Sequence, residues 1–147
     1  MRGRGILRAM PIPLAINLDD GWTVEYFEQN PEPHELASVG QFVPSLRRFV
    51  PGRRYGAGWT AWLTRTFDVP PMLDVCLRFD LHISAAPGTI MLYLNGRRMG
   101  EVDGRQPFVF DVTDFITLED NQIALRVDCA SEGVFGAVSV KAEPCNA

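Results

Sequence analysis

Residues 89–116 read TIMLYLNGRRMGEVDGRQPFVFDVTDFI, and this stretch decides the fold. Its first six residues place apolar Ile90, Leu92 and Leu94 on one face, which is the period-2 pattern of a strand with one buried side. The dipeptide Asn95-Gly96 follows at once. Because both residues tolerate positive φ, it predicts a tight hairpin turn and a return strand that ends at Val102.

The second half of this stretch predicts another turn and a third strand. Asp103-Gly104 is a turn dipeptide, and residues 108–112 alternate again between apolar and polar side chains. Asp111 or Thr113 could cap a single helical turn that ends near Ile116. Three short strands joined by two tight turns indicate antiparallel β-structure.

The same alternation predicts strands in the rest of the chain, at residues 21–27, 61–69, 75–83, 122–129 and 134–142. Arg65 interrupts the apolar face of one of them, so either a bulge resets the phase there or the arginine reaches an end of the sandwich. Residues 30–58 have no sustained periodicity and predict a long irregular connection, which often carries function. About eight short strands without a long amphipathic helix predict an all-β, antiparallel jelly-roll β-sandwich.

The length of the chain predicts a single domain. With 147 residues it can hold a two-layer core, but it is too short for a sandwich together with a catalytic barrel of roughly 250 residues. We expect a lead-in at residues 1–20 that is partly extended or disordered, the sandwich at residues 21–143 and a tail at residues 144–147.

The charge balance limits which kinds of partner the chain can bind, and the N-terminal sequence bears on its cellular compartment. Eighteen acidic and fourteen basic residues leave a formal charge of −4, which argues against nucleic acid and anionic membrane as partners. The N-terminal MRGRGILR is basic, but Pro11 and Pro13 interrupt the apolar run behind it, so we expect a cytoplasmic protein, with export as the alternative. Cys76, Cys129 and Cys145 show no metal-ligand spacing and cannot all pair internally, which favours reduced thiols.

Several motifs occur in one order along the chain. They are Leu94-Asn95-Gly96 with Gly100, residues 107–114 (PFVFDVTD), residues 120–127 (DNQIALRV) and, upstream, residues 62–70 (WLTRTFDVP). The set resembles the N-terminal, jelly-roll sugar-binding domain of glycoside hydrolase family 2, the β-galactosidase and β-glucuronidase group, within the galactose-binding domain-like fold. The resemblance covers residues 21–142 and implies a sandwich that binds carbohydrate.

The resemblance also implies a non-catalytic domain, because the paired catalytic carboxylates of those hydrolases lie on a separate barrel. Asp103, Asp111 and Asp114 have the spacing of turn and cap residues rather than of such a pair. His34 and His82 have no acidic or nucleophilic partner in the sequence. No cofactor or metal is predicted, although some relatives of this fold hold a structural calcium ion.

Aromatic residues supply the first candidate site, since sugar binding needs an exposed aromatic plate and fixed hydrogen-bonding groups. Alternation sets Trp62 opposite the core residues of its strand, and Tyr55 and Trp59 precede it in a glycine-containing loop. The alternative is that these rings fill space beneath the loop. If two loops meet at one end of the sandwich, polar contacts could come from Asp103, Arg105 and Gln106.

A second candidate site is a basic cluster made of Arg47, Arg48, Arg53 and Arg54. Guanidinium groups beside apolar and aromatic residues can bind carboxylates, phosphates or acidic protein surfaces in a bidentate manner. A solvated loop that balances the acidic body is the alternative.

Three functions fit these patterns. The leading hypothesis is a non-catalytic binding module that recognises a carbohydrate or a protein through its end loops. The main alternative is a structural or assembly protein, in which a sheet face or edge strand forms a homo-oligomer or a complex with another protein. The third is an accessory subunit of a glycoside hydrolase.

Overall fold

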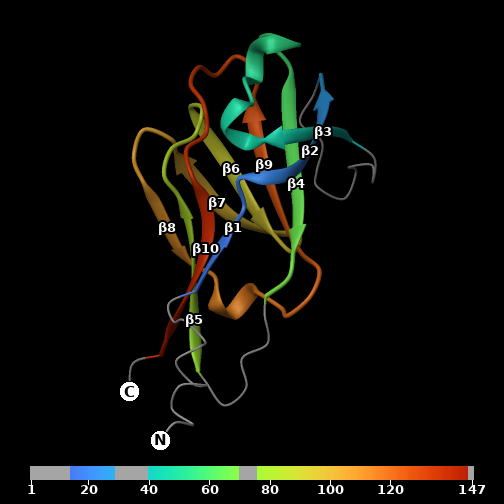
Figure 1. The fold of residues 1–147 in the computed structure, drawn as a ribbon. Helices are drawn as coiled ribbons and strands as arrows, with labels where there is room; N and C mark the ends of the chain where they lie inside the picture. The colour runs from blue at the N-terminus through green and yellow to red at the C-terminus, as the bar shows by residue number, and fades with distance from the viewer. Residues whose placement is uncertain (1–13, 29–39, 70–75, 146–147) are drawn as a thin grey trace, which may run out of the picture.

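The computed structural model describes residues 14–28, 40–69 and 76–145. Within these residues the chain forms ten strands and three short 3-10 helices (Figure 1). In chain order the elements are β1 (Leu14–Asn17), β2 (Asp20–Phe27), β3 (Gln41–Ser45), η2 (Leu46–Arg48), η3 (Pro51–Arg53), β4 (Thr60–Phe67), β5 (Leu77–Ile83), β6 (Thr89–Leu94), β7 (Arg97–Asp103), β8 (Phe108–Asp111), η4 (Thr113–Phe115), β9 (Asn121–Asp128) and β10 (Val138–Pro144).

The strands form two sheets, one in the order β1-β10-β5-β8 and the other in the order β3-β2-β4-β9-β6-β7. Every strand pair is antiparallel, and the sheets stack into a sandwich, so the predicted fold class is confirmed. Two strands more than expected are present. The first is β1, which lies in the segment predicted as a lead-in and pairs with β10. The second is β3, which lies in the segment predicted as an irregular connection and pairs with β2.

The core lies between the sheets and consists of the inward residue of each alternating pair. Trp22, Leu63, Leu92 and Leu125 are fully buried there. The indole nitrogen of Trp22 donates a hydrogen bond to the carbonyl oxygen of Leu18 at 2.6 Å, which satisfies the one polar atom of that side chain. Burial of such side chains is the main source of stability for the sandwich.

The hairpin at residues 89–103 forms as predicted. Asn95 and Gly96 have φ values of 52° and 81°, the left-handed pair that a primed two-residue turn requires. Gly104, in the next turn, is needed for a different reason. A Cβ atom there would lie 2.0 Å from the carbonyl oxygen of Ala86, so only glycine allows the two backbones to approach so closely.

The interruption at Arg65 is explained without a bulge, because β4 and β9 stay in register over the whole of β4. The guanidinium group instead reaches the start of β2, where Nε donates to the carbonyl oxygen of Asp20. A second contact, 3.7 Å from NH2 to Oδ1, joins Arg65 to the Asp20 carboxylate. The long side chain therefore carries its charge out of the core.

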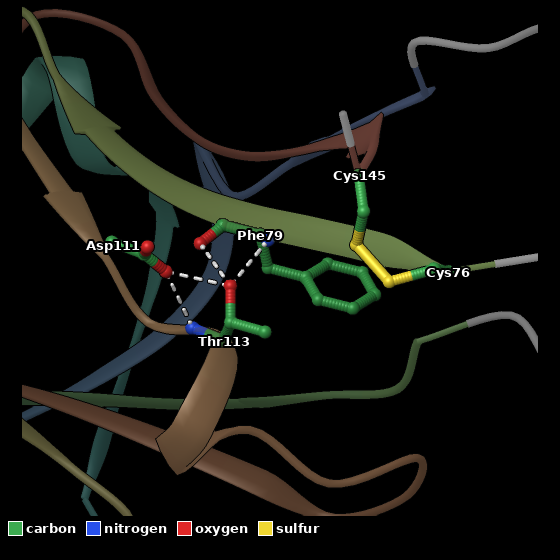
Figure 2. The surroundings of a disulfide bond; sticks show 5 residues. All are labelled: Cys76, Phe79, Asp111, Thr113 and Cys145. Carbon is green, nitrogen blue, oxygen red and sulfur yellow. Dashed lines mark hydrogen bonds between the residues drawn. A yellow bond between two sulfur atoms is a disulfide. The ribbon is translucent and has the colours of Figure 1, made fainter. Parts of the chain in front are cut away.

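Cys76 and Cys145 form a disulfide, so the prediction of reduced thiols is wrong for these two residues (Figure 2). The register of β5 with β10 explains the pairing: Leu77 lies opposite Pro144, and the next residues along are the two cysteines. Their Cα atoms are 5.3 Å apart, and Cys145 N donates to the carbonyl oxygen of Cys76 at 2.9 Å. The sandwich thus continues into the segment predicted as a tail.

Two further details concern the last strand and the third cysteine. Val134 was expected on the last strand, but β10 begins at Val138 and Val134 is exposed in the preceding loop. Phe135 takes the buried position instead. Cys129 is a free, buried thiol on the apolar face, as its strand pattern predicts.

The single helical turn expected before Ile116 is present as η4. Figure 2 shows that Thr113 joins it to β5 and β8. The Thr113 backbone N–H and hydroxyl both donate to Asp111 Oδ1, at 3.0 and 2.6 Å, and the Thr113 hydroxyl oxygen accepts from Phe79 N at 2.9 Å. The two bonds that Thr113 donates to Asp111 hold the pKa of Asp111 below its usual value.

Candidate functional site

The strongest candidate site is built by residues 46–54, LRRFVPGRR, which connect β3 to the loop before β4. Apolar anchors and arginines alternate along this segment. Leu46, Phe49 and Pro51 are buried, while the four arginines between and after them are exposed. The first of two 3-10 turns places Leu46 and Phe49, three residues apart, on the same buried side, and Pro51 begins the second turn.

Contacts with the sandwich fix the backbone of this segment. Leu46 N donates to the carbonyl oxygen of Asp19 at 2.6 Å, and the Phe49 ring lies 6.5 Å from that of Phe135. Gly52 approaches the end of β9 so closely that a Cβ atom would lie 3.0 Å from the carbonyl oxygen of Cys129. The arginines therefore project from a loop whose backbone is held in place by contacts with the sandwich.

A groove of about 430 Å³ opens between this segment and strands β2 and β3; we call it the arginine groove. Its arginines are Arg48, Arg53 and Arg54. Apolar and aromatic side chains form most of the remaining wall, together with Gln41 and Ser45. Two of the apolar residues are exposed to solvent: Phe42 is 69% exposed and Val50 is 36% exposed. Figure 1 places the teal turns η2 and η3 at the upper end of the sandwich, at the opposite end from η4.

The charges of the arginine groove are not neutralised by the described residues. Arg54 donates to the neutral side-chain oxygen of Gln41, and Arg48 and Arg53 form no ion pair within the described part of the chain. Arg47, the fourth member of the predicted cluster, behaves differently. It lies outside the lining of the groove and pairs with Asp19 at 3.3 Å.

An aromatic ladder adjoins the arginine groove. The rings of Tyr55 and Trp59 stack with centroids 3.9 Å apart and an interplanar angle of 15°, and Tyr26 meets Tyr55 at 4.9 Å with an angle of 57°. Tyr26 also lines the groove, and burial is the main cause that raises its pKa. Tyr55 and Trp59 are half-buried and pack against the core, so one face of each ring is already used.

Trp62 is not the exposed plate that alternation suggested. It lies on the face of β4 opposite the main core, as predicted, but only 1% of it is exposed. Ala124 on the adjacent strand β9 and Met91 and Tyr93 on β6, the strand beyond it, cover Trp62, with the Tyr93 ring centroid 5.1 Å away. The alternation pattern shows on which face of the sheet a side chain lies, but it does not show whether side chains from other strands cover it. The expected exposure of Trp62 is wrong for this reason.

The turn after the hairpin satisfies its own polar groups. Arg105 donates from Nε and NH2 to the carboxylate of Asp103 at 3.1 and 3.0 Å, and these hydrogen bonds lower the pKa of Asp103. Gln106 N donates to the carbonyl oxygen of Asp103 at 3.2 Å. None of the three residues lines the arginine groove, so the two predicted groups of polar residues are not brought together there.

The sequence patterns did not indicate Tyr26, Phe42 or Val50 as site residues. Tyr26 shares the face of Trp22 and Val24 in the strand predicted at residues 21–27. Phe42 lies in the five residues of β3, where Pro44 conceals the strand signal. The signals for this site were the arginine cluster and the long connection predicted at residues 30–58.

Within residues 14–28, 40–69 and 76–145, no three His, Cys, Asp or Glu side chains are gathered so that they could ligate a metal ion. Burial is the main cause that lowers the pKa of His82, and Lys141 lowers it further. His34 lies outside the described residues. None of the helices in the described segments has the length and apolar character needed to cross a membrane.

Comparison with solved structures confirms the fold that the sequence motifs implied. The chain superposes on a β-glucuronidase from Bifidobacterium dentium, complexed with coumarin-3-O-glucuronide, with a TM-score of 0.74, 18% identity, and coverage of 93% of this chain and 31% of that one. An uncultured Clostridium sp. β-glucuronidase gives a TM-score of 0.73, 17% identity and coverages of 92% and 31%. A β-glucuronidase from Ruminococcus gnavus, complexed with a C6-substituted uronic isofagomine, gives 0.74, 13%, 92% and 30%.

The match concerns a part of those enzymes, since the chain spans less than a third of the length of each of these three. At these identities the likeness shows the fold alone. A scan against protein-family models found no match, and neither did a search of the curated proteins.

Proposed function

We propose that this chain is a non-catalytic carbohydrate-binding module derived from the sugar-binding domain of a glycoside hydrolase. The observation that carries the proposal is the arginine groove, which lies on anchored loops at one end of the sandwich and has an aromatic ladder beside it. Support also comes from the fold, which is shared with a fraction of several β-glucuronidases, and one of those enzymes is complexed with a glucuronide.

The shape and chemistry of the groove suit a small sugar derivative. Its volume of about 430 Å³ falls within the range of roughly 300–1,000 Å³ typical of ligand sites. Apolar walls at Phe42, Val43 and Tyr26 offer surface for the less polar face of a ring, and guanidinium groups offer paired donors in a rigid fork.

The test is a titration of the intact chain with a panel of monosaccharides and aryl glycosides, followed by ¹⁵N NMR. Binding should shift the amide signals of residues 41–54 and disappear in Arg53→Ala/Arg54→Ala. Arg47→Ala is the matched control, because it removes a charge from the same segment without touching the groove. Shifts confined to another surface, or equal losses in both variants, would refute this site.

A second candidate function rests on the exposure of Phe42 and Val50. Aromatic and arginine side chains together are enriched at protein interfaces, so the same surface could dock a protein partner or a second copy of the chain. In that case the mass measured by light scattering should rise with concentration, and Phe42→Ser should prevent the rise. An accessory-subunit role would appear as co-purification with a barrel-bearing hydrolase.

The disulfide leads us to propose an oxidising compartment rather than the cytoplasm expected from the N-terminal sequence. Disulfides persist in secreted and periplasmic proteins and are rare where thiols are kept reduced. Thiol counting on protein isolated from its native source tests this. One accessible thiol after denaturation fits the proposal, and three contradict it.

A further inference from the structure

The strand β8 lies at the edge of its sheet and has no neighbouring strand on one side. We infer that β8 is a docking edge, at which an extended segment of a partner protein that carries acidic residues pairs as an additional strand. The inference goes beyond the carbohydrate-binding proposal and does not depend on it, because it concerns another surface and another class of ligand.

The first step compares the edges of the two sheets. Among the described strands, β1 and β8 are the edges of one sheet, and β3 and β7 are the edges of the other. Natural sheets protect their edges with features such as prolines and bulges, because an open edge pairs with other chains. Pro44 lies within β3, and a bulge at Met99 shifts the register of β7 with β6. β1 borders residues outside the described part of the chain, whereas β8 contains neither proline nor bulge and stays in register with β5.

The second step identifies the backbone groups that β8 leaves open. Val112 N donates to the carbonyl oxygen of Phe79 at 2.8 Å, which fixes the phase of the ladder between this segment and β5. In an antiparallel ladder, every second residue directs its N–H and C=O toward the neighbouring strand. The two phenylalanines of β8 therefore direct these groups toward β5, while those of Val109 and Asp111 point away from the sheet. A strand placed beside β8 would pair with them.

The third step concerns the surface beside this edge. A groove of about 430 Å³ is lined by residues of β7, β8 and η4, and we call it the edge groove. Its apolar residues are Met99, Phe110 and Phe115, which are half-buried and pack against the core. On the other face of β8, Val109 is 55% exposed. Side chains of an added strand would cover apolar surface on both faces of β8, and this burial would stabilise the pairing.

The fourth step concerns charge. Arg97 and Arg98 line the edge groove, and neither forms an ion pair within the described part of the chain. The arginine groove also contains arginines without ion pairs, so positive charge alone does not identify a site. In the edge groove the charge lies beside an open strand edge, and this combination favours an extended segment with acidic side chains.

A second copy of the chain fits this edge less well. Two β8 strands that paired antiparallel about Phe110 would be related by a two-fold axis. Both copies would then bring Arg97 and Arg98 to the same side of the joined sheet. Because like charges placed together destabilise strand pairing, the charge pattern favours a different partner.

The experiment uses a peptide probe, acetyl-Thr-Glu-Thr-Val-Thr-Glu-Thr-amide. The sequence reads the same in both directions, so it presents Glu, Val and Glu on one face in either orientation of the strand. A second probe has Lys in place of both Glu residues and tests the charge. A third carries N-methyl groups on the two central Thr residues, whose N–H groups would meet β8, and it tests the backbone hydrogen bonds.

Dissociation constants are measured by NMR titration of the intact ¹⁵N-labelled chain, and hydrogen exchange follows individual amides. The variant Val109→Pro removes an outward N–H at an edge position, where proline is tolerated. Arg97→Ala/Arg98→Ala removes the charge of the edge groove, and Arg53→Ala/Arg54→Ala is the control that removes the same charge elsewhere. Thermal midpoints verify that each variant is folded.

We expect the acidic probe to slow exchange at the amides of Val109 and Asp111 and to bind about tenfold more tightly than either of the other probes. Its affinity should fall about tenfold in Val109→Pro and in Arg97→Ala/Arg98→Ala, and it should persist in the charge-matched control.

Equal affinity for the three probes, slowed exchange at another edge, or no binding at all would overturn the inference. A mass that rises with concentration without any probe, together with slowed exchange at Val109 and Asp111, would assign the edge to a second copy and overturn it as well. If Val109→Pro does not fold, the N-methylated probe tests the same backbone bonds with the wild-type chain. None of the probes contains a sugar, so these results leave the carbohydrate-binding proposal to its own test.

Discussion

The two ends of the sandwich differ in how a prominent group of polar side chains is satisfied. At the end that carries η4, which we call the closed end, Asn121 is fully buried and makes five hydrogen bonds, to Asn95, Phe67 and Thr117. Figure 2 shows Thr113, the first residue of η4, in the surroundings of the disulfide between Cys76 and Cys145. At the opposite end, the arginine groove leaves three charged side chains without a charged partner in the described chain.

This difference separates the residues that hold the fold from those free to bind something. A buried amide without partners would cost several kcal/mol, so the closed end has to satisfy every member of its network. The exposed guanidinium groups are satisfied by water and cost little in the free protein. The contrast predicts that mutations at the closed end lower stability, whereas mutations in the arginine groove lower binding.

The largest expected effect is that of removing the disulfide. The variant Cys76→Ser/Cys145→Ser should lose about 4 kcal/mol, the chain-entropy value for closing a loop of 69 residues. Urea unfolding of the oxidised, reduced and mutant proteins measures the loss. Reduced wild type and the double variant should agree, and a reduced protein as stable as the oxidised one would show that the bond constrains little.

Asn121→Ala should be nearly as damaging. The change removes the hydrogen-bond partners of the Thr117 carbonyl oxygen and of the Thr117 backbone N–H and creates a cavity, so we expect a loss of about 3 kcal/mol and a fall in the melting temperature of about 10 °C. The neighbouring exposed Gln122 provides the control, since Gln122→Ala keeps the backbone bond to Asn95. Similar melting temperatures for the two variants would mean that the network is dispensable.

Local patterns predicted most of the fold. The hairpin of β6 and β7 could be predicted because its strand pattern, its Asn95-Gly96 turn and its return strand lie within a few residues of one another. The strands β1 and β3 could not be predicted in this way, since each is short and is held in place by pairing with another strand. Leu14 pairs with Ala142, far away in the sequence, and no local pattern records that contact.

The site was predictable only in part, for the same reason. The arginine cluster is visible in the sequence, but the pairing of Arg47 with Asp19 and the freedom of Arg53 depend on how distant segments fold together. The exposure of Trp62 depends on Met91 and Tyr93 from another strand. The disulfide likewise follows from the register of β5 with β10 and not from cysteine spacing.

An intermediate effect on stability is expected at high pH from Cys129, which lies at the same end of the sandwich as the arginine groove. Burial raises the pKa of this thiol to about 11, against about 8.5–9 for an unfolded chain. The folded state therefore retains its proton while the unfolded state loses it, so stability is complete below pH 8.5 and falls as the pH rises toward 11. The expected loss is about 2 kcal/mol.

Cys129→Ala isolates that contribution, because Tyr26 and other groups also titrate at high pH. The difference in unfolding free energy between wild type and Cys129→Ala should narrow by about 2 kcal/mol between pH 8 and pH 11. A difference that stays constant over this range would show that the thiol is solvated in the folded protein.

The smallest effect on stability is expected from mutations in the arginine groove, where the effect on ligand binding should be largest. Arg53→Ala/Arg54→Ala removes two exposed side chains, of which only Arg54 has a side-chain partner, Gln41, so the unfolding free energy should change by less than about 0.5 kcal/mol. Relief of repulsion among neighbouring guanidinium groups could even raise it slightly, most visibly at low salt. Urea unfolding at two salt concentrations measures the change. A loss above 2 kcal/mol would mean that these arginines hold the loop, and the contrast between a structural end and a binding end would fail.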